Sequence, residues 1–248
     1  MKTAGGSLPY KTFNFRPSTL PMPDIVLATL NAKYPHCAFG LRYLHANLGP
    51  LAERSVLREF TSQQPPLEIV ERLLADAPRI IGLGCYIWNV QETAAVVALL
   101  RSLRPDIVLV LGGPEVSYEI EAQPWLQQVD YVITGEADLA FRELCEQLLN
   151  GSAERVNSTA RPEVIHAAVP NLAEVNLPYE LYTDEDLAHR VLYVEASRGC
   201  PFTCEFCLSS LDIPVRAFPT DAFLASMQRL LDRGATQFKF VDRTFNLH

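Results

Sequence analysis

The sequence has no long apolar run and no excess of basic residues. Its longest apolar stretch, TAAVVALL, is too short to cross a bilayer. The N-terminal stretch MKTAGGSLPYKTFNFRPSTLPMP has no apolar core behind its lysine, so we do not expect it to be a secretory signal. A formal net charge of −8 leaves no basic stripe for phosphate backbones. We therefore expect a cytoplasmic protein that acts on a small molecule, with no membrane and no nucleic-acid partner.

Disulfides and a dinucleotide fingerprint are also not expected. In a reducing cytosol, the six cysteines are better explained as ligands, redox groups or core residues. No G-x-G-x-x-G motif follows the first apolar run, so the sequence gives no sign of NAD binding. With 248 residues, nearly half of them hydrophobic, the chain is long enough to bury the core of one large domain or of two modest ones.

Between residues 24 and 150, five short apolar runs alternate with amphipathic stretches. The apolar runs cover 24–30, 53–60, 79–85, 106–113 and 130–135. The helical patterns cover 37–48, 65–77, 89–104, 118–129 and 137–150. Repeated strand-then-helix units produce a parallel sheet, because each right-handed crossover places a helix on one of its faces. The pattern predicts an α/β fold whose N-terminal domain is a doubly wound parallel five-stranded sheet, Rossmann- or flavodoxin-like.

The remaining chain divides into three further segments. Residues 1–23 are expected to be an N-terminal extension, ahead of the 24–150 domain. Residues 151–189 are polar and turn-rich, which indicates a linker with one short candidate strand at 163–169. Residues 190–248 begin a second β-α-β unit.

That second unit has a strand at 190–197, a helix at 220–234 and a strand at 236–242. Thr220 is expected to cap the start of the helix, and Gly234 to follow its end. The loop after the first of these strands therefore lies at the carboxyl end of a parallel strand, where α/β enzymes carry their chemistry.

This loop reads RGCPFTCEFC and places Cys200, Cys204 and Cys207 at C-x3-C-x2-C spacing. Three thiolates hold three corners of a [4Fe–4S] cluster and leave one iron open for another ligand. A structural zinc site takes four ligands, and here the fourth would have to be a distant residue such as His189. The spacing favours iron–sulfur over zinc. Cys37, Cys85 and Cys145 have no partner at ligand spacing and are interpreted as structural.

The cysteine loop resembles the signature of the radical S-adenosylmethionine (SAM) superfamily, which has an aromatic residue, here Phe206, just before the final cysteine. The resemblance implies that the open iron binds the amino and carboxylate groups of SAM, and that one electron cleaves SAM to a 5′-deoxyadenosyl radical. It implies SAM contacts from Phe206, and from Asp242 and Asn246 near the end of the second strand. Asp242 and Asn246 are equally explained as an exposed strand end.

The upstream segments LGGPEVSYE (111–119) and YVITGEAD (131–138) make the chain similar to cobalamin (B12)-binding radical SAM proteins. The resemblance implies a corrinoid held against the carboxyl edge of the sheet, where the loops after parallel strands converge. The residues expected to contact it are Asn31, His36, Tyr86, Trp88, Gly112, Gly113, Glu115, Gly135 and Glu136. Without a ligand, the glycines are ordinary turn residues, the aromatics cap the core, and His36 is a hydrogen-bonded loop residue.

Two departures from this family qualify the prediction. Many corrinoid domains carry D-x-H-x-x-G, whereas here His36 follows Tyr34 by two positions and precedes Gly40 by four. We therefore expect cobalamin without a protein ligand on cobalt, or a domain that has lost cobalamin. Only 41 residues follow Cys207, so the six-unit partial barrel of the family is expected to be incomplete.

The resemblance implies methyl transfer to, or rearrangement of, an unreactive carbon centre. The expected partners are a small-molecule substrate and an electron donor of the flavodoxin or ferredoxin type. Two alternatives stay open: a radical SAM enzyme whose empty corrinoid domain serves recognition, and an iron–sulfur or zinc-binding fragment without turnover.

Overall fold

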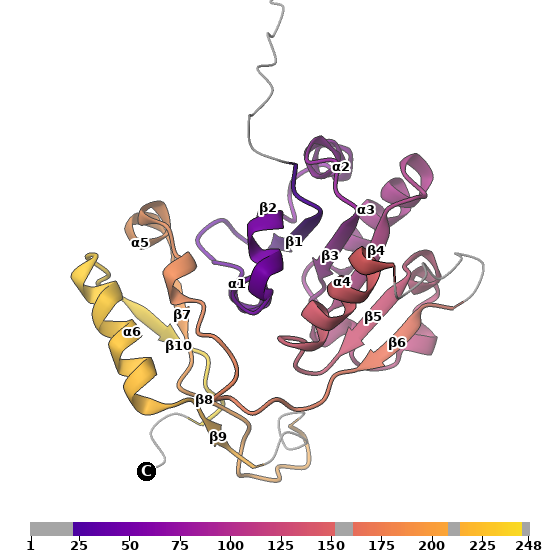
Figure 1. Ribbon diagram of the computed structural model, residues 1–248. Coiled ribbons are helices and arrows are strands. Elements are labelled where there is room, and N and C mark those ends of the chain that lie inside the picture. Colours follow the sequence, from indigo (N-terminus) through magenta and orange to yellow (C-terminus); the bar gives the residue numbers. More distant parts are fainter. Residues whose placement is uncertain (1–21, 152–160, 208–213, 245–248) are drawn as a thin grey trace, which may run out of the picture.

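A computed structural model of the chain describes residues 22–151, 161–207 and 214–244, and Asn246 lies outside these residues. Two α/β units are connected in sequence (Figure 1). The first contains a six-stranded parallel sheet, and the second contains a smaller parallel strand pair. The α/β prediction with a parallel sheet is confirmed.

The large sheet follows directly from the apolar runs. Its strands are β1 (Ile25–Asn31), β2 (Ser55–Thr61), β3 (Ile80–Gly84), β4 (Val108–Gly112), β5 (Tyr131–Thr134) and β6 (Glu163–His166). They lie in the order β2-β1-β3-β4-β5-β6, and every pair is parallel. All seven residues of β1 are buried, as expected for a central strand covered by helices on both faces.

The prediction of five strands is wrong by one. β6 adds to the edge of the sheet beside β5, with Glu163 paired to Tyr131 and His166 to Thr134. It lies in the segment that we expected to be a linker, and it confirms the candidate strand at 163–169 over Glu163–His166. A four-residue edge strand with exposed ends buries little apolar surface, so its sequence carries a weak pattern.

Helices cover both faces of the sheet. α1 (Phe39–Ala46), the 3₁₀ turn η1 (Gly49–Arg54) and α4 (Ala140–Asn150) pack on one face. α2 (Pro66–Ala75) and α3 (Val90–Leu103) pack on the other. Because successive strand residues point to opposite faces, Leu27 belongs to the first core and Val26 to the second.

The prediction of a helix at 118–129 is also wrong. The segment after β4 forms three short 3₁₀ turns: η2 (Pro114–Val116), η3 (Ile120–Ala122) and η4 (Pro124–Gln128). Glu119 has a left-handed backbone with φ of +50°, and Pro124 cannot donate a helical hydrogen bond. These two residues interrupt a segment whose apolar spacing otherwise suits a helix.

The second unit contains η5 (Tyr179–Leu181), α5 (Asp184–His189), β7 (Leu192–Val194), β8 (Ser197–Arg198), β9 (Arg216–Ala217), α6 (Thr220–Asp232) and β10 (Phe238–Phe240). β7 and β10 are parallel, and β8 and β9 are antiparallel. Thr220 is the first residue of α6 and does not cap it, because Pro219 occupies the cap position. Gly234 follows the helix with φ of +95°.

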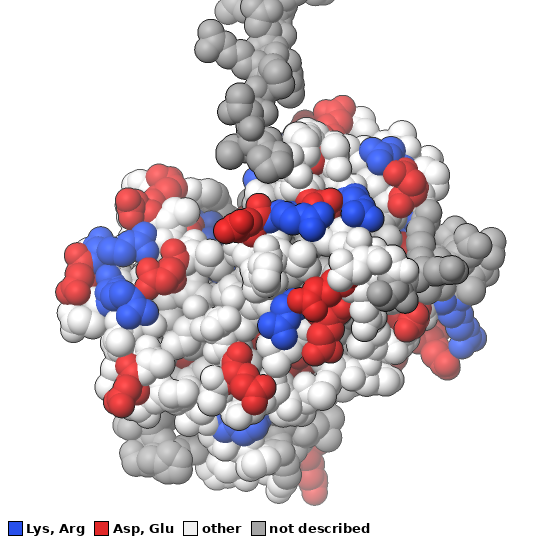
Figure 2. All heavy atoms as spheres, in the orientation of Figure 1, with Lys and Arg blue, Asp and Glu red and all other residues white. Residues whose placement is uncertain are grey.

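The surface carries charges of both signs. On the face shown in Figure 2, basic side chains lie beside acidic ones and form no continuous basic patch. Within the described residues, no helix is long and apolar enough to cross a membrane.

Candidate functional site

A cavity of about 260 Å³ lies against the sheet at its carboxyl edge, beside α1 and α4. Gly82 and Gly84 of β3 and Gly112 of β4 line it. In the sheet register, Gly82 lies beside Val110, and Gly84 beside Gly112. A Cβ at Gly82 would lie 3.0 Å from the side chains of Leu27 and Phe141, so this glycine lets α4 approach the sheet closely. A Cβ at Gly112 would meet only the Ile133 carbonyl, at 3.5 Å, so the space beside this glycine is open.

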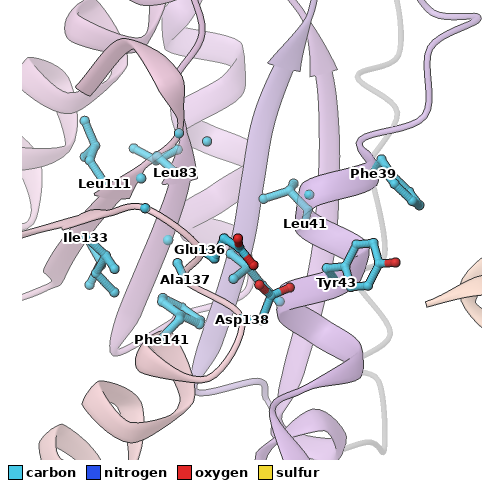
Figure 3. A pocket seen from close by; sticks show the side chains of 18 of the residues that line it. Phe39, Leu41, Tyr43, Leu83, Leu111, Ile133, Glu136, Ala137, Asp138 and Phe141 are labelled. Atoms are coloured by element: carbon cyan, nitrogen blue, oxygen red, sulfur yellow. The ribbon is translucent and has the colours of Figure 1, made fainter. Parts of the chain in front are cut away.

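The other walls of this cavity come from helices and loops (Figure 3). α1 contributes Leu41 and Tyr43, and α4 contributes Phe141. Figure 3 shows Glu136 and Asp138 close together in the loop that leads into α4. The cavity is therefore apolar along the sheet and acidic at one end.

Two glycines at this edge have backbone conformations that favour glycine. Gly113, just after β4, has φ of +113°, and a Cβ there would lie 2.4 Å from the carbonyl oxygen of Cys85. Gly135, just after β5, has φ of +80°. The β4 loop can therefore pass close to the β3 loop only with glycine at position 113.

A second cavity of about 480 Å³ lies between the carboxyl end of the sheet and the second unit. It is lined by Thr29, Asn31, Ala32, His36, Cys37, Ala38, Phe39, Gly40, Tyr86, Trp88, Tyr193 and Val241. It is located after β1 and β3, the neighbouring strands at which the strand order reverses, where open α/β sheets bind ligands. Phe39, Gly40 and Tyr86 line both cavities, so the two spaces adjoin.

The aromatic wall of the second cavity is a stacked pair. The rings of Tyr86 and Trp88 are nearly parallel, with centroids 4.6 Å apart, and Trp88 is 49% exposed. Asn89 holds their loop in place: its side-chain oxygen accepts from the Tyr86 N–H at 2.8 Å, and its amide donates to the Leu30 carbonyl at 2.9 Å. The loop thus presents two flat aromatic faces at a fixed place.

His36 connects the two units. Its Nδ1 lies 2.5 Å from the hydroxyl of Tyr193 on β7, and its carbonyl accepts a hydrogen bond from Arg190. Asn31 lies nearby, and its amide donates to Glu59 at 2.7 Å. His36 is therefore hydrogen-bonded through Nδ1, and the amide of Asn31 is engaged by a carboxylate.

The cysteines outside the loop are buried and protonated. Burial raises the pKa of the Cys37, Cys85 and Cys145 thiols to about 12. Cys37 also donates to Asp186 at 3.6 Å. Buried thiols with such high pKa values stay protonated and unreactive at neutral pH, which fits the structural role expected for them.

The cysteine loop begins directly after β8. Cys200 is buried, Cys207 is partly buried, and Cys204 is exposed, with a turn in which the Cys207 N–H donates to the Cys204 carbonyl at 3.1 Å. Across the described ranges, no three His, Cys, Asp or Glu side chains converge on a point that could hold a metal ion. A cubane cluster does not need one common point, because each thiolate binds a different iron. The donor chemistry of the loop fits such a cluster.

Two of the residues expected to contact SAM can be placed. Phe206 is 95% exposed beside Cys207. The Asp242 carboxylate accepts from the N–H groups of Ala196 and Ser197 and from the Ser197 hydroxyl, at 2.7 to 3.1 Å. Asp242 therefore fixes the corner between β7 and β8, just ahead of the cysteine loop.

Among the residues expected at the corrinoid site, eight line one or both cavities, and Glu115 lines neither. Glu115 lies in η2, where its carbonyl accepts from Gln123 at 2.8 Å. Sequence reasoning missed Phe39, Tyr43, Asp138, Phe141, Glu195 and Arg198, all of which line the first cavity. Gly82, within the apolar strand IIGLG, was a usable signal, because glycine inside a strand often marks a close approach.

These features define an α/β protein with two adjoining cavities at the carboxyl edge of a parallel sheet and a three-cysteine loop beside them. Residues 25–145 match the B12 binding domain family. The domain that they form is similar to B12 binding domains, and the chain is similar to a cobalamin-dependent radical SAM methyltransferase.

Three similar proteins illustrate the relationship. An uncharacterized methyltransferase of Pyrococcus horikoshii is 28% identical over 187 residues, which cover 69% of this chain and 41% of that protein. The cobalamin-dependent radical SAM methyltransferase TokK of Streptomyces tokunonensis is 29% identical over 152 residues, which cover 52% and 22% of the two chains. This chain thus spans less than half the length of either relative.

The third is a solved structure of OxsB, a cobalamin-dependent S-adenosylmethionine radical enzyme, with aqua-cobalamin and S-adenosylmethionine bound. It superposes with a TM-score of 0.72 at 18% identity, covering 91% of this chain and 34% of that one. The two proteins therefore share a fold across both units of this chain.

Proposed function

We propose that this chain binds cobalamin in the two adjoining cavities and holds a [4Fe–4S] cluster on Cys200, Cys204 and Cys207. In this proposal it is part of a radical SAM enzyme that transfers a methyl group to an unreactive carbon of a small-molecule substrate. The observation that carries the proposal is the first cavity itself. Its walls combine residues of the B12-binding domain with Glu195 and Arg198, which directly precede the cysteine loop.

The shape and lining of the cavities support cobalamin as the ligand. Cobalamin has two bulky parts, a flat corrin ring and a nucleotide tail, and the chain offers two spaces that share three wall residues. The stacked Tyr86 and Trp88 give the larger space a flat apolar wall. Gly84 and Gly112 give the smaller space a surface that a group can approach closely. Such concave, mostly apolar sites with a few polar groups are typical of cofactor sites.

The chain's residues then have distinct tasks. The Cys200, Cys204 and Cys207 thiolates would hold three irons, and Asp242 would hold the corner from which their loop starts. His36, hydrogen-bonded to Tyr193, would fix the wall of the larger cavity. When bound, the reduced cluster supplies the electron that cleaves SAM to a 5′-deoxyadenosyl radical, and cobalamin supplies the methyl group. The electron itself would come from a flavodoxin- or ferredoxin-type donor.

Anaerobic reconstitution tests the proposal. The chain is purified without oxygen, supplied with iron, sulfide and hydroxocobalamin, and analysed for iron, acid-labile sulfide, absorbance and retained cobalamin. A variant with Cys200, Cys204 and Cys207 all changed to alanine is the control, and we expect it to lose iron and keep cobalamin.

Other outcomes of this experiment distinguish the alternatives. Zinc in place of iron, or equal iron in the triple variant, contradicts the cluster assignment. Iron without cobalamin supports a radical SAM protein with an empty corrinoid domain. With SAM and a reductant, deoxyadenosine formation supports SAM cleavage, whereas a stable cluster without deoxyadenosine supports cofactor binding without turnover.

A further inference from the structure

Arg198 lies between the two proposed cofactor sites. It is two residues before Cys200, and its side chain is 13% exposed in the wall of the smaller cavity. One terminal nitrogen donates to Asp138 at 2.7 Å and to Glu136 at 2.8 Å, and the other donates to Asp138 at 3.2 Å. Its Nε donates to Glu195 at 2.9 Å. The guanidinium therefore joins the cysteine-bearing unit to the loop that forms the acidic end of the cavity.

Aromatic rings fix the plane of this guanidinium. Its Cζ lies 4.7 Å from the ring centroid of Tyr43 on α1 and 5.4 Å from that of Phe218. A planar guanidinium that is stacked and also bound through both terminal nitrogens to a carboxylate has little freedom to rotate. Lysine cannot reproduce this geometry, because an ammonium group is a point charge without a planar fork.

The backbone transmits this constraint to the first cysteine. Arg198 pairs with Arg216 across β8 and β9, and Arg216 also binds Glu136. Gly199 follows with φ of +94°, and Cys200 comes next and is buried. On the other side, Asp242 holds Ser197. The position of Cys200 is thus set by residues whose partners form the cavity wall.

We infer that Arg198 is a positioning residue that couples the two sites, so that occupancy of the cavity and assembly of the cluster on Cys200 favour each other. The inference rests on the proposed function, since it requires both cofactors to bind this chain. A ligand in the cavity needs the Glu136 and Asp138 loop in place, and the cluster needs Cys200 in place. One side chain holds both. Coupling of this kind is reciprocal, so each ligand strengthens the other by the same factor.

The test compares two dissociation constants for hydroxocobalamin, measured anaerobically on iron-free chain and on cluster-loaded chain. For the unaltered chain we expect about tenfold tighter binding when the cluster is present. For Arg198→Lys we expect a ratio near one, with circular dichroism and melting temperature reporting that the chain still folds. Arg229→Ala is the matched control, because Arg229 on α6 forms an exposed ion pair with Glu180 in η5 and lines neither cofactor cavity. It should keep the tenfold ratio.

Asp138→Asn tests the same coupling from the other side of the contact. It leaves Arg198 and the cysteine loop unchanged in sequence, so a ratio near one in this variant cannot come from a damaged loop. If Arg198→Lys does not fold, Asp138→Asn alone tests the coupling. If Arg198 only stabilised the fold, the variants would bind hydroxocobalamin more weakly both without and with the cluster. The ratio of the two dissociation constants would then stay unchanged. A ratio near one in the unaltered chain with both cofactors bound, or an unchanged ratio in both variants, overturns the inference alone. A chain that binds neither cofactor overturns the proposed function as well.

Discussion

Arg190, which follows α5, donates from both terminal nitrogens to both carboxylate oxygens of Glu59 on β2, at 3.2 and 2.6 Å. Arg42 donates to the same Glu59 at 2.6 Å and to Asp186 at 2.9 Å. Arg190 also reaches Asp186 at 2.9 Å. Two arginines and two carboxylates thus alternate in a nearly buried, charge-balanced network between the units. Since Arg190 also binds the carbonyl of His36, the network fixes one wall of the larger cavity.

Removing one member of this network should lower the free energy of unfolding. Arg190→Ala leaves Glu59 and Asp186 with only Arg42 for charge balance, and breaking a buried pair in this way costs about 3 to 5 kcal/mol. Urea denaturation measures the change in the free energy of unfolding. Arg229→Ala is the control, because exposed pairs contribute about 1 kcal/mol or less. Equal effects of the two substitutions would contradict a stabilising role for the network.

The same network predicts loss of stability in acid. Burial by itself would raise the pKa of Glu59, but the hydrogen bond from Arg190 and the charge of Arg42 outweigh it and hold that pKa below its ordinary value of 4.5. Burial would likewise raise the pKa of Asp186, but the hydrogen bond from the Thr183 N–H and the charge of Arg42 outweigh it and hold that pKa below its ordinary value of 3.8. The unfolded chain then binds these protons more tightly, so stability is present above these ordinary values and is lost as the pH falls through the lower folded-state values.

Melting temperatures recorded between neutral pH and pH 3 check this acid prediction. Glu59→Gln removes one of the two titrating groups, so its melting temperature, although lower at neutral pH, should fall less steeply below pH 4.5. Parallel curves for the variant and the unaltered chain would show that other carboxyl groups control the acid transition.

Filling the smaller cavity should block cobalamin without unfolding the chain. Gly112→Leu is suited to this, because a Cβ at this position meets only the Ile133 carbonyl, at an ordinary 3.5 Å. Its side chain would occupy the space beside Gly84 and Val110. We expect about tenfold weaker hydroxocobalamin binding, a loss of roughly 1.4 kcal/mol, and unchanged iron incorporation. Ala75→Leu, which introduces the same side chain at an exposed position of α2, should bind normally. Unchanged cobalamin affinity in Gly112→Leu would locate the ligand elsewhere.

Asp242 was expected to contact SAM, and its hydrogen bonds give it another task. Asp242→Ala removes the acceptor for two backbone N–H groups and one hydroxyl, which should lower the free energy of unfolding by about 1 to 3 kcal/mol. The affinity of the cluster-loaded variant for SAM should then fall as well, because the corner that holds the cysteine loop is less stable. If instead stability is unchanged and SAM binding is abolished, Asp242 contacts SAM directly.

The sequence predicted most of what depends on local pattern. The five apolar runs became β1 to β5, since a strand buried on both faces leaves a clear apolar signature. The candidate strand at 163–169 became β6, but the weak pattern of a short edge strand did not show that it joins the sheet. The apolar spacing after Val116 predicts a helix, which Pro124 prevents. Arg198 could not be found this way. Its partners Glu136 and Asp138 lie about 60 positions earlier, and only the fold brings them together.

The walls of the smaller cavity likewise include residues that the sequence indicates and residues that only the fold brings there. The glycines after the strands indicated the edge of the sheet at which the smaller cavity lies, since a missing side chain can be seen in the sequence. The opposing walls, Tyr43 on α1 and Phe141 on α4, looked like ordinary core residues. Whether an apolar helix residue packs on the sheet or faces a cavity depends on what lies across from it, and that information is tertiary.

The central claim is that the cavities at the carboxyl edge of the sheet form a cobalamin site. The most direct test is the amount of cobalamin that stays with the iron-free chain after incubation with hydroxocobalamin and gel filtration, measured by absorbance and by cobalt content. We expect nearly one cobalamin for each chain, and markedly less for Gly112→Leu. Negligible cobalt in the protein fraction from a folded, unaltered chain would contradict the claim.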